Sequence, residues 1–525
     1  MPSFNSEFDL IIIGSGMGSM TCAALMAKLF KKKVLVLEQH FVVGGFTHEF
    51  ARKNKYQWDV GLHYVGEMQK GLPRQIMDFI TDKQLQWHKM PAHFEKFVYP
   101  DFSFWVPDKL EKYIADLIER FPNEAAAIKK YFRDVSHIAM WWSWRHHLAE
   151  VFPLPLRLPV QLLNRFYKNK ALQTTEDYLS QHFQDEKLKA LLASQWGDYG
   201  LPPSQSAFVI HAAIVHHYFN GGYYPVGGAQ KIAKNIRAVV EKAGGQFLTR
   251  RAVTEIIVKN NQAIGVKVNA KTGTSEQEEE YFAPIIVSGV GAVNTFLRLV
   301  PHSSRPSFIE EIKAFPKGSS ALSLYIAFKE SPEKLGFKGE NHWIFEHYEH
   351  NQALKGDTLL DSINYCFLSF PSLKDPESKI HTAEIVKICD CYAIFEKWQA
   401  QEWKQREAEY YELKEQITEK LLNLVEKHYP GFKALVEYTE LSTPLTLEHF
   451  SHRLHGAMYG MPAIPAKYDK KWLSAKTPIK NLYLTGSDVW SLGIAGAMMG
   501  GVVTASLLAG KLGFFKIVRG VKRNV

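Results

Sequence analysis

The hydrophobic positions at the start of the chain predict a β–α–β unit. The run "FDLIII" (Phe8–Ile13) is short, apolar and rich in β-branched residues, which is typical of a strand buried on both faces. Small and apolar residues continue through "MGSMTCAALMAKLF" and predict a helix with a buried inner face. "KKVLVLE" (Lys32–Glu38) predicts a second strand. This start favours an α/β fold with a parallel sheet.

The pattern changes character further along the chain. Residues 70–220 read as largely helical, and residues 244–270 alternate as strands around a polar turn. "APIIVSGVGA" (Ala283–Ala292) is again a buried strand followed by glycines, but no acidic residue ends the next strand-like run. We therefore do not expect a separate NAD(P) site there.

The last 50 residues combine a strand with a long uncharged run. "NLYLTG" (Asn481–Gly486) predicts the strand, and no charge occurs from Val489 to Gly510. Length alone would allow this run to cross a membrane. Its many Gly and Ala residues, with Asp488 just before it, favour a buried helix whose N-terminus points at a cofactor.

The loop between the first strand and helix has the glycines of a dinucleotide site. Gly14 allows the tight turn, and Gly16 allows the backbone to approach a pyrophosphate at the helix N-terminus. Ser19 stands where a third glycine is usual, and it is small enough for close helix–strand packing. Glu38 ends the second strand, where a carboxylate can bind ribose hydroxyls. The sequence predicts dinucleotide binding.

Composition and charge narrow the function classes. The chain has 525 residues, 46% hydrophobic and 13% aromatic, enough for a large core or a large apolar cavity. The net charge is +9, but no Lys/Arg block with interleaved aromatic residues indicates nucleic acid. Four cysteines are too few for a disulfide scaffold and form no metal-ligand pattern, so we expect reduced cysteines and no metal. The first residues lack the features of a signal peptide, which favours the cytoplasmic side.

Two segments have the composition of a membrane-surface contact. The region 137–170 contains Trp141, Trp142 and Trp144 beside Arg145, and Trp with flanking basic residues suits a membrane interface. The tail Lys511–Val525 alternates basic and bulky apolar residues and has no acid. The alternatives are a core helix pair and a packed or disordered tail.

Several motifs, taken in order along the chain, resemble one flavoprotein family, that of the phytoene desaturases, carotenoid isomerases and retinol saturases. The match is closest to the retinol saturase and carotenoid isomerase branch, and the stretches near 130–200 and 335–430 carry no motif of it. Phe46 follows the double glycine, where the desaturases commonly have Arg. The motifs are "GSGMGSM" followed by "LEQH", "VVGGFTHEF", "WDVGLHYVG", "GGYYPVGGAQKIAKNI" and "LYLTGSDVWSLGIAGAMMGG".

The resemblance implies FAD, bound along a discontinuous Rossmann-type domain. That domain would comprise residues 1–70, 221–300 and 476–525, the last including the basic tail. It would be interrupted by a helical substrate-binding or membrane-associating region (71–220) and a mixed α+β substrate domain (301–475). The residues placed at FAD by the match are Gly14, Ser15, Gly16, Met17, Gly18, Glu38, Gln39, Gly44, Gly45, Phe46, Gly61, Val253, Gly289, Gly486, Asp488, Gly493, Ile494 and Ala495.

The resemblance also implies hydride exchange at flavin N5 with a long apolar polyene or isoprenoid lipid. Saturation of a double bond requires a proton donor as well as a hydride. His63 is our first candidate for this donor, with Tyr64 and Tyr459 behind it, and the alternative for His63 is a structural role under the flavin.

The reaction itself stays open at this stage. Saturation, desaturation and redox-neutral cis–trans isomerisation all fit the same motifs. Electrons would come from a partner, from NAD(P)H that diffuses to the flavin, or from a bound quinone. Two other function classes remain as alternatives: an amine-oxidase-type enzyme acting on a smaller substrate, and a non-catalytic flavoprotein that binds lipid.

Overall fold

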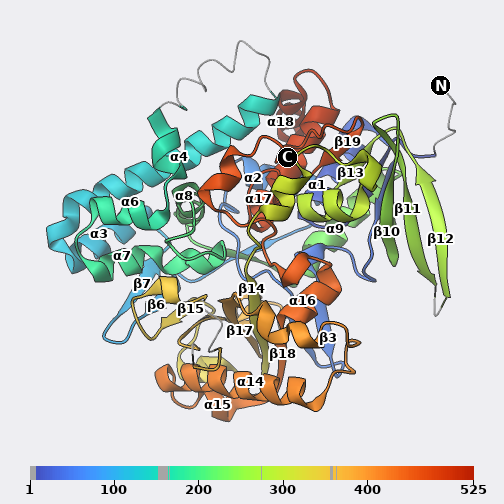
Figure 1. Ribbon diagram of the computed structural model, residues 1–525. Helices are drawn as coiled ribbons and strands as arrows, with labels where there is room; N and C mark the ends of the chain where they lie inside the picture. The colour runs from blue at the N-terminus through green and yellow to red at the C-terminus, as the bar shows by residue number, and fades with distance from the viewer. Residues whose placement is uncertain are drawn as a thin grey trace.

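A five-stranded parallel sheet forms the nucleotide-binding layer of the computed structural model (Figure 1). The structure describes residues 7–524 except 152–163, 165, 273–274, 355–358 and 362. The predicted α/β fold is confirmed, and the strands of this sheet come from three distant parts of the chain. In spatial order they are β19 (Leu482–Leu484), β13 (Ile286–Ser288), β1 (Leu10–Ile13), β2 (Val34–Leu37) and β9 (Gln246–Leu248).

Glycines, which have no side chain, let two helices pack closely against each other beside this sheet. The helix α1 (Met17–Ala24) follows β1, and α17 (Gly493–Leu508) lies against it. A Cβ atom on Gly18 would lie 2.4 Å from the Cα of Gly486 and 2.8 Å from a carbonyl oxygen of α17. Ser19, as predicted, packs closely, because a Cβ on Gly289 would lie 1.9 Å from its hydroxyl oxygen.

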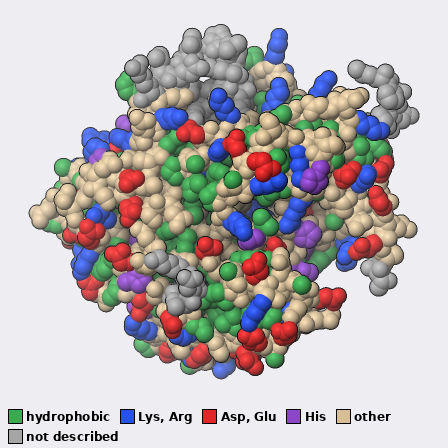
Figure 2. All heavy atoms as spheres, in the orientation of Figure 1, with side chains coloured by type: hydrophobic (Ala, Val, Ile, Leu, Met, Phe, Trp, Pro, Cys, Tyr) green, Lys and Arg blue, Asp and Glu red, His purple; other side chains and the backbone are tan. Residues whose placement is uncertain are grey.

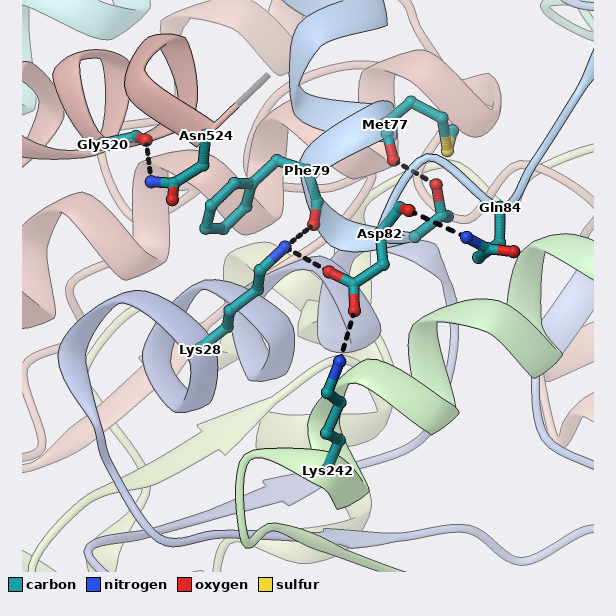
Figure 3. A network of polar contacts seen from close by, with 9 residues as sticks. Lys28, Met77, Phe79, Asp82, Gln84, Lys242, Gly520 and Asn524 are labelled. Carbon is teal, nitrogen blue, oxygen red and sulfur yellow. Dashed lines mark hydrogen bonds and ion pairs between the residues drawn. The ribbon is translucent and has the colours of Figure 1, made fainter.

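Further helices surround the sheet, and a network of charges ties three segments together. Lys28, in the short helical segment after α1, donates to the carbonyl of Phe79 at 2.5 Å and to Asp82 at 2.6 Å (Figure 3). Lys242 lies 3.5 Å from the other Asp82 oxygen, and Lys28 holds the pKa of Asp82 below its usual range. The helices that surround the sheet are α2 (Leu72–Ile80), α9 (Gln230–Lys242), α10 (Ala292–Asn294) and α11 (Ile309–Ala314).

An antiparallel three-stranded sheet stands at the edge of the nucleotide-binding layer (Figure 1). Its central strand is hydrogen-bonded on both sides, and Val266 and Val268 on it are fully buried against the main core. The strands are β10 (Arg251–Lys259), β11 (Gln262–Thr272) and β12 (Ser275–Phe282).

A seven-stranded sheet forms the second domain. Its pairs are antiparallel except β15 with β6, and helices α14 and α15 cover its outer side (Figure 1). In order, the strands are β18 (Val436–Ser442), β14 (Ser320–Phe328), β17 (Thr382–Cys389), β16 (Tyr365–Ser369), β15 (Asn341–Phe345), β6 (His93–Val98) and β7 (Ser103–Pro107). The helices of this domain are α12 (Pro371–Lys374), α13 (Tyr392–Phe395), α14 (Ala408–His428), α15 (Phe432–Leu435) and α16 (Pro444–Ser451).

The region 71–220 is less uniformly helical than we expected. It contributes β6 and β7 to the seven-stranded sheet, because alternating buried residues such as Phe94 and Phe104 extend that sheet's core. Next to this region, β3 (Glu49–Arg52) and β4 (Tyr56–Asp59) form a hairpin, and β5 (Trp87–Lys89) pairs with β8 (Tyr223–Pro225), which is distant in sequence. The helices here are α3 (Leu110–Arg120), α4 (Ala125–Val151), α6 (Thr175–His182), α7 (Glu186–Ala193) and α8 (Phe208–His217).

Two tryptophans of α4, Trp141 and Trp142, do not face outward as the membrane hypothesis required. Trp141 and Trp142 are 3% and 4% exposed within an aromatic core, and Trp142 meets Tyr468 edge to face. The side chains of residues 144–151 and the segment 152–163 lie outside the described residues, so Trp144 and Arg145 stay untested. The interior of α4 is therefore an ordinary core contact.

The C-terminal helices bend sharply. Helix α18 (Gly513–Asn524) leaves α17 at an angle of 116°. Over the part of the chain that is described, no single helix has both the length and the apolar character to span a membrane; only this bent pair would pass, on length and composition alone.

The expectation of four reduced cysteines is wrong in this structure, because Cys389 and Cys391 form a disulfide.

Candidate active site

One large cavity extends from the glycine loops of the parallel sheet to the inner face of the seven-stranded sheet. Its volume is about 1520 Å³, and its walls include the loops after β1 and β2, the start of α17, and residues of α4, α8 and β17. Ligands of open α/β sheets bind beyond the carboxyl ends of the parallel strands, and the cavity begins there. Figure 2 shows hydrophobic side chains gathered at the centre of the face between the two domains.

The glycines at one end leave bare backbone on the cavity wall. No heavy atom lies within 4 Å of a Cβ placed on Gly16, Gly486 or Gly493. Any side chain there would therefore enter the cavity itself. Gly14 has a φ of +84°, a turn that favours glycine. Bare backbone beside the N-terminus of α1 fits the pyrophosphate of a dinucleotide.

A chain of hydrogen bonds holds the two glycine loops in register. Glu38 accepts from the backbone N–H and the hydroxyl of Ser15, at 2.8 and 2.6 Å, and from the N–H of His40 at 2.8 Å. The Ser15 hydroxyl oxygen accepts from the N–H of Gly44 at 3.0 Å. Glu38 thus organises the loop as well as lining the cavity where we expected ribose contact.

The predicted FAD residues come together on one wall. All of them except Asp488 line the cavity. Asp488 lies beneath the wall and accepts from the N–H groups of Ala292 at 2.9 Å and Met461 at 3.3 Å. It holds the loop after β13 in place, and its direct contact with the cofactor stays a prediction.

Sequence reasoning missed a cation on this wall. Arg453 lines the cavity, with its guanidinium 5.1 Å from the centre of the Phe46 ring. Its side chain donates to the Met458 carbonyl, and within the described residues no carboxylate oxygen lies within 4 Å of it. This guanidinium lies beside the residue that replaces the arginine of the desaturases. A cation there can neutralise part of the pyrophosphate charge of FAD.

The three predicted catalytic residues all line the far part of the cavity. The Nδ1 of His63 lies 3.0 Å from Oε2 of the buried Glu384. Burial, with the nearby charge of Lys374, lowers the pKa of His63 to about 3. With that pKa, His63 is a neutral imidazole at neutral pH.

Tyr459 packs its ring against Gly200 and donates to the Gly197 carbonyl at 3.2 Å.

A buried lysine stands behind His63. Lys374 donates to the carbonyl of His63 at 2.9 Å, to Oδ1 of Asn341 at 2.5 Å and to the hydroxyl of Ser369 at 2.6 Å. Burial lowers the pKa of Lys374 to about 7, and burial raises that of Glu384 to about 8. We call Lys374, His63, Glu384, Asn341 and Ser369, with the nearby charge of Asp59, the Lys374 cluster. Its proton and charge states change near neutral pH.

A second buried group surrounds Tyr64 and contains no cation. The Tyr64 hydroxyl lies 2.5 Å from Oε1 of Glu95 and 2.7 Å from Oδ2 of Asp198. Glu95 also accepts from Trp343 at 3.0 Å and from Gln195 at 2.6 Å. We call these residues the Asp198 cluster. Its carboxyls lie more than 100 residues apart in sequence, so only the fold shows that they meet.

The comparisons with known proteins agree with this site. A family model described as "Flavin containing amine oxidoreductase" matches residues 20–509. The chain is 32% identical to all-trans-retinol 13,14-reductase of Danio rerio, covering 96% of this chain and 86% of the relative. It is 26% identical to prolycopene isomerase 2, chloroplastic, of an Oncidium hybrid cultivar, covering 97% and 85%.

A solved structure extends the match in shape. Cyclohexylamine oxidase from Brevibacterium oxydans IH-35A superposes with a TM-score of 0.60 at 15% identity, covering 98% of this chain and 99% of that one. At this identity the likeness shows the fold alone. The family match confirms the predicted FAD cofactor and the predicted class of FAD-dependent oxidoreductase or isomerase. The chain belongs to the flavin-containing amine oxidoreductase family, in the branch that includes the all-trans-retinol 13,14-reductases and the prolycopene isomerases.

Proposed function

We propose that this protein is an FAD-dependent enzyme that acts on carbon–carbon double bonds of a long apolar polyene, by saturation, desaturation or cis–trans isomerisation. The observation that carries the proposal is the single cavity that joins the glycine cradle to an aromatic chamber with buried proton-carrying groups. Relatives that match 96–97% of the chain carry the names of a retinol reductase and a carotenoid isomerase.

The residues of this chain have distinct tasks in such a reaction. Bound FAD supplies hydride exchange. The glycine loops bind its pyrophosphate through backbone N–H groups, and the N-terminus of α17 stabilises negative charge near Gly493. Aromatic and aliphatic side chains of the chamber orient the polyene and exclude water from the reacting atoms.

The amine-oxidase alternative has less support. Solved amine oxidases share the fold at 15% identity, which carries no substrate information. The relatives with higher identity are named for polyenes. A cavity of about 1520 Å³ also exceeds the roughly 300–1,000 Å³ of common small-molecule sites, as a long substrate beside FAD requires.

The test begins with the purified protein. Its visible spectrum and mass spectrometry of an organic extract show whether flavin and a long apolar lipid copurify. Anaerobically reduced protein is then mixed with all-trans-retinol or with prolycopene, and reoxidation of the flavin and the products are followed. Reoxidation or isomerisation supports the proposal. Turnover of small amines, with no response to either polyene, overturns it in favour of the amine oxidase.

The electron source needs its own measurement. NAD(P)H and a quinone are the two diffusible candidates. Rapid mixing of the oxidised enzyme with NADH or NADPH, and of the reduced enzyme with a soluble quinone, compares their rates. A redox-neutral isomerase would turn over prolycopene without consuming either one.

We also propose that the protein binds the surface of an anionic membrane through α18, on the cytoplasmic side. Leu512 and Phe515 are 49% and 45% exposed, whereas Ile517 and Val521 anchor the helix inside. In Figure 2, Lys and Arg side chains stand out from the upper edge, where Figure 1 places α18. Within the described chain, none of the basic side chains in and just before α18 has an ion pair with an acid; they are Lys511, Lys516, Arg519, Lys522 and Arg523.

The path into the cavity fits this orientation. Met140 of α4 lines the cavity and is 48% exposed, and α4 packs against α17, which leads into α18. Vesicles of phosphatidylserine and phosphatidylcholine test the proposal in a sedimentation assay. Full-length protein should bind in a salt-sensitive manner and a variant lacking 511–525 should bind more weakly. Equal binding by both proteins would contradict it.

A further inference from the structure

We propose that Asp198 donates the proton when this enzyme saturates a double bond, and that Tyr64 connects Asp198 to Glu95 as a hydrogen-bond switch. The inference rests on the proposed function and assigns the acid that the reaction requires. It differs from the sequence hypothesis, in which His63 had that role.

Local backbone geometry places the Asp198 carboxyl on the cavity wall. Asp198 ends the 3₁₀ helix 194–198, whose other residues are buried, and it lines the cavity. A Cβ on Gly197 would lie 2.4 Å from the Trp343 ring, and one on Gly200 would lie 2.7 Å from the Tyr459 ring. The two glycines thus allow this turn to pack against aromatic rings, and of the two residues between them Asp198 lines the cavity while Tyr199 is buried.

Counting protons shows that the Asp198 cluster holds an acid. The Tyr64 hydroxyl lies within hydrogen-bond distance of both Glu95 and Asp198, but it has one proton to donate. If both carboxyls were ionised, one of them would face the Tyr64 oxygen with no proton between them. One carboxyl therefore carries a proton and donates it to Tyr64.

The remaining hydrogen bonds place that proton on Asp198. Glu95 accepts from Trp343 and Gln195 in addition to Tyr64, and three donors stabilise an ionised carboxylate. Asp198 has no second hydrogen-bond partner among the described residues. Burial, and then the charge of Glu95, raise the pKa of Asp198 well above its ordinary value, whereas that of Glu95 rises to about 7.

The reaction step balances with this arrangement. The Asp198 O–H bond breaks and its proton forms a C–H bond at one carbon of the double bond. Bound FAD, once reduced by a two-electron donor, would supply the hydride for the adjacent carbon and would be left oxidised. The carboxylate of Asp198 then accepts from Tyr64, whose hydroxyl turns from Glu95 toward it, until water returns the proton after product release.

The neutral His63 fits this role less well. Its pKa of about 3 means that it has no imidazolium proton to give at neutral pH, and its Nδ1 faces Glu384. The titratable groups that surround Asp198 and its partner Glu95 are Tyr64, Tyr113, Tyr199, Tyr218, Tyr459 and Lys374.

The first experiment compares Asp198→Asn with wild type in a single turnover. Photoreduced protein is mixed with all-trans-retinol in H₂O and in D₂O, and the return of oxidised flavin is timed. We expect the variant to react at least about 100-fold more slowly than wild type, and to lose the solvent isotope effect. The control is Asp134→Asn, since Asp134 is likewise an aspartate hydrogen-bonded to a tyrosine hydroxyl, that of Tyr178 at 2.7 Å, but does not line the cavity. A variant within about twofold of wild type, with the same isotope effect, would overturn the inference.

A second measurement does not depend on turnover. Infrared difference spectra of the flavin-loaded proteins at a pH of about 8 isolate single carboxyls, because other buried acids such as Glu384 contribute equally to both spectra. Wild type minus Asp198→Asn should contain a protonated carboxylic acid band that wild type minus Asp134→Asn lacks. Tyr64→Phe should shift that band, because Asp198 loses its acceptor. Absence of the band from the Asp198→Asn difference spectrum would overturn the inference. If wild type neither reduces nor isomerises any polyene but the infrared band is lost in Asp198→Asn alone, the proposed function fails and the assignment of the acid to Asp198 stands.

Discussion

The two ends of the cavity are built for binding by different means. At the cofactor end, bare backbone faces the ligand, because Gly16, Gly486 and Gly493 have open space where a Cβ would stand. At the polyene end, the ionisable side chain of Asp198 lines the cavity among aromatic rings, and Lys374 is buried behind the wall, where it donates to the carbonyl of His63. The first end depends on shape, whereas the second depends on where protons reside. Mutations at the two ends should therefore fail in different assays.

The largest expected effect separates binding from folding at the cofactor end. Gly16→Val should abolish FAD binding, because the side chain enters the space that we assign to the pyrophosphate. Gly16 has φ −66° and ψ 169°, which valine adopts without strain, so the apoprotein should fold. Flavin absorbance of the purified variant and its circular dichroism give the two readings. A yellow, fully loaded variant would disprove the assignment.

Gly18→Val is the contrasting control. Its side chain would collide with the backbone of Gly486 and α17 and not with the cofactor space. We expect a loss of about 3 kcal/mol or more in unfolding free energy. Thermal unfolding of both apoproteins measures the difference. Equal stability of the two variants would contradict the distinction between a binding and a packing glycine.

Lys374→Met tests the polyene end. The substitution removes three buried hydrogen bonds and leaves Asn341 and the His63 carbonyl without their donor. We expect a loss of about 3 kcal/mol in unfolding free energy. Lys470→Met removes a half-exposed ion pair with Glu311 and should cost about 1 kcal/mol or less. Urea unfolding of both variants checks the pair, and a similar small loss in each would show that the Lys374 cluster is not structural.

The pH dependence of stability sharpens the same comparison. Burial raises the pKa of Glu384 from about 4.5 to about 8, so the folded state keeps a proton that the unfolded chain releases between these values. This contribution is complete below about pH 4.5 and is lost as the pH rises toward 8, by up to about 1.4 kcal/mol per pH unit. Glu384→Gln should remove this slope. Lys374 acts in the opposite sense above about pH 7, since its pKa is lowered to about 7.

The measurement is urea unfolding of wild type and Glu384→Gln at several pH values. Subtracting the two curves cancels the contribution of Lys374 to first order. Glu333→Gln, an exposed glutamate, serves as the control and should leave the slope unchanged. Parallel curves for wild type and Glu384→Gln would show that Glu384 ionises normally in the folded protein.

Much of the cofactor end could be predicted from the sequence, because its signals are local. Gly14, Gly16 and Glu38 lie within one β–α–β unit, whose spacing indicates their task. The polyene end could not be predicted in this way. Glu95 and Asp198 meet only because β6 joins the seven-stranded sheet, in a region that read as helical. Trp141 and Trp142 misled for a related reason, since their neighbours in the core come from distant segments.

The smallest expected effect concerns the one place where the cofactor end uses a charge. Arg453→Met should weaken FAD binding about tenfold, because a guanidinium without a carboxylate within 4 Å is available to the pyrophosphate. Raising the salt concentration should weaken FAD binding more in wild type than in the variant. Arg298→Met is the control, since Arg298 also lines the cavity but is exposed and donates to the His452 carbonyl. Titration of the apoproteins with FAD measures all three affinities. If Arg453→Met bound FAD as tightly as wild type with the same salt dependence, backbone groups alone would neutralise the pyrophosphate, and Phe46 would stand in place of an arginine that nothing replaces.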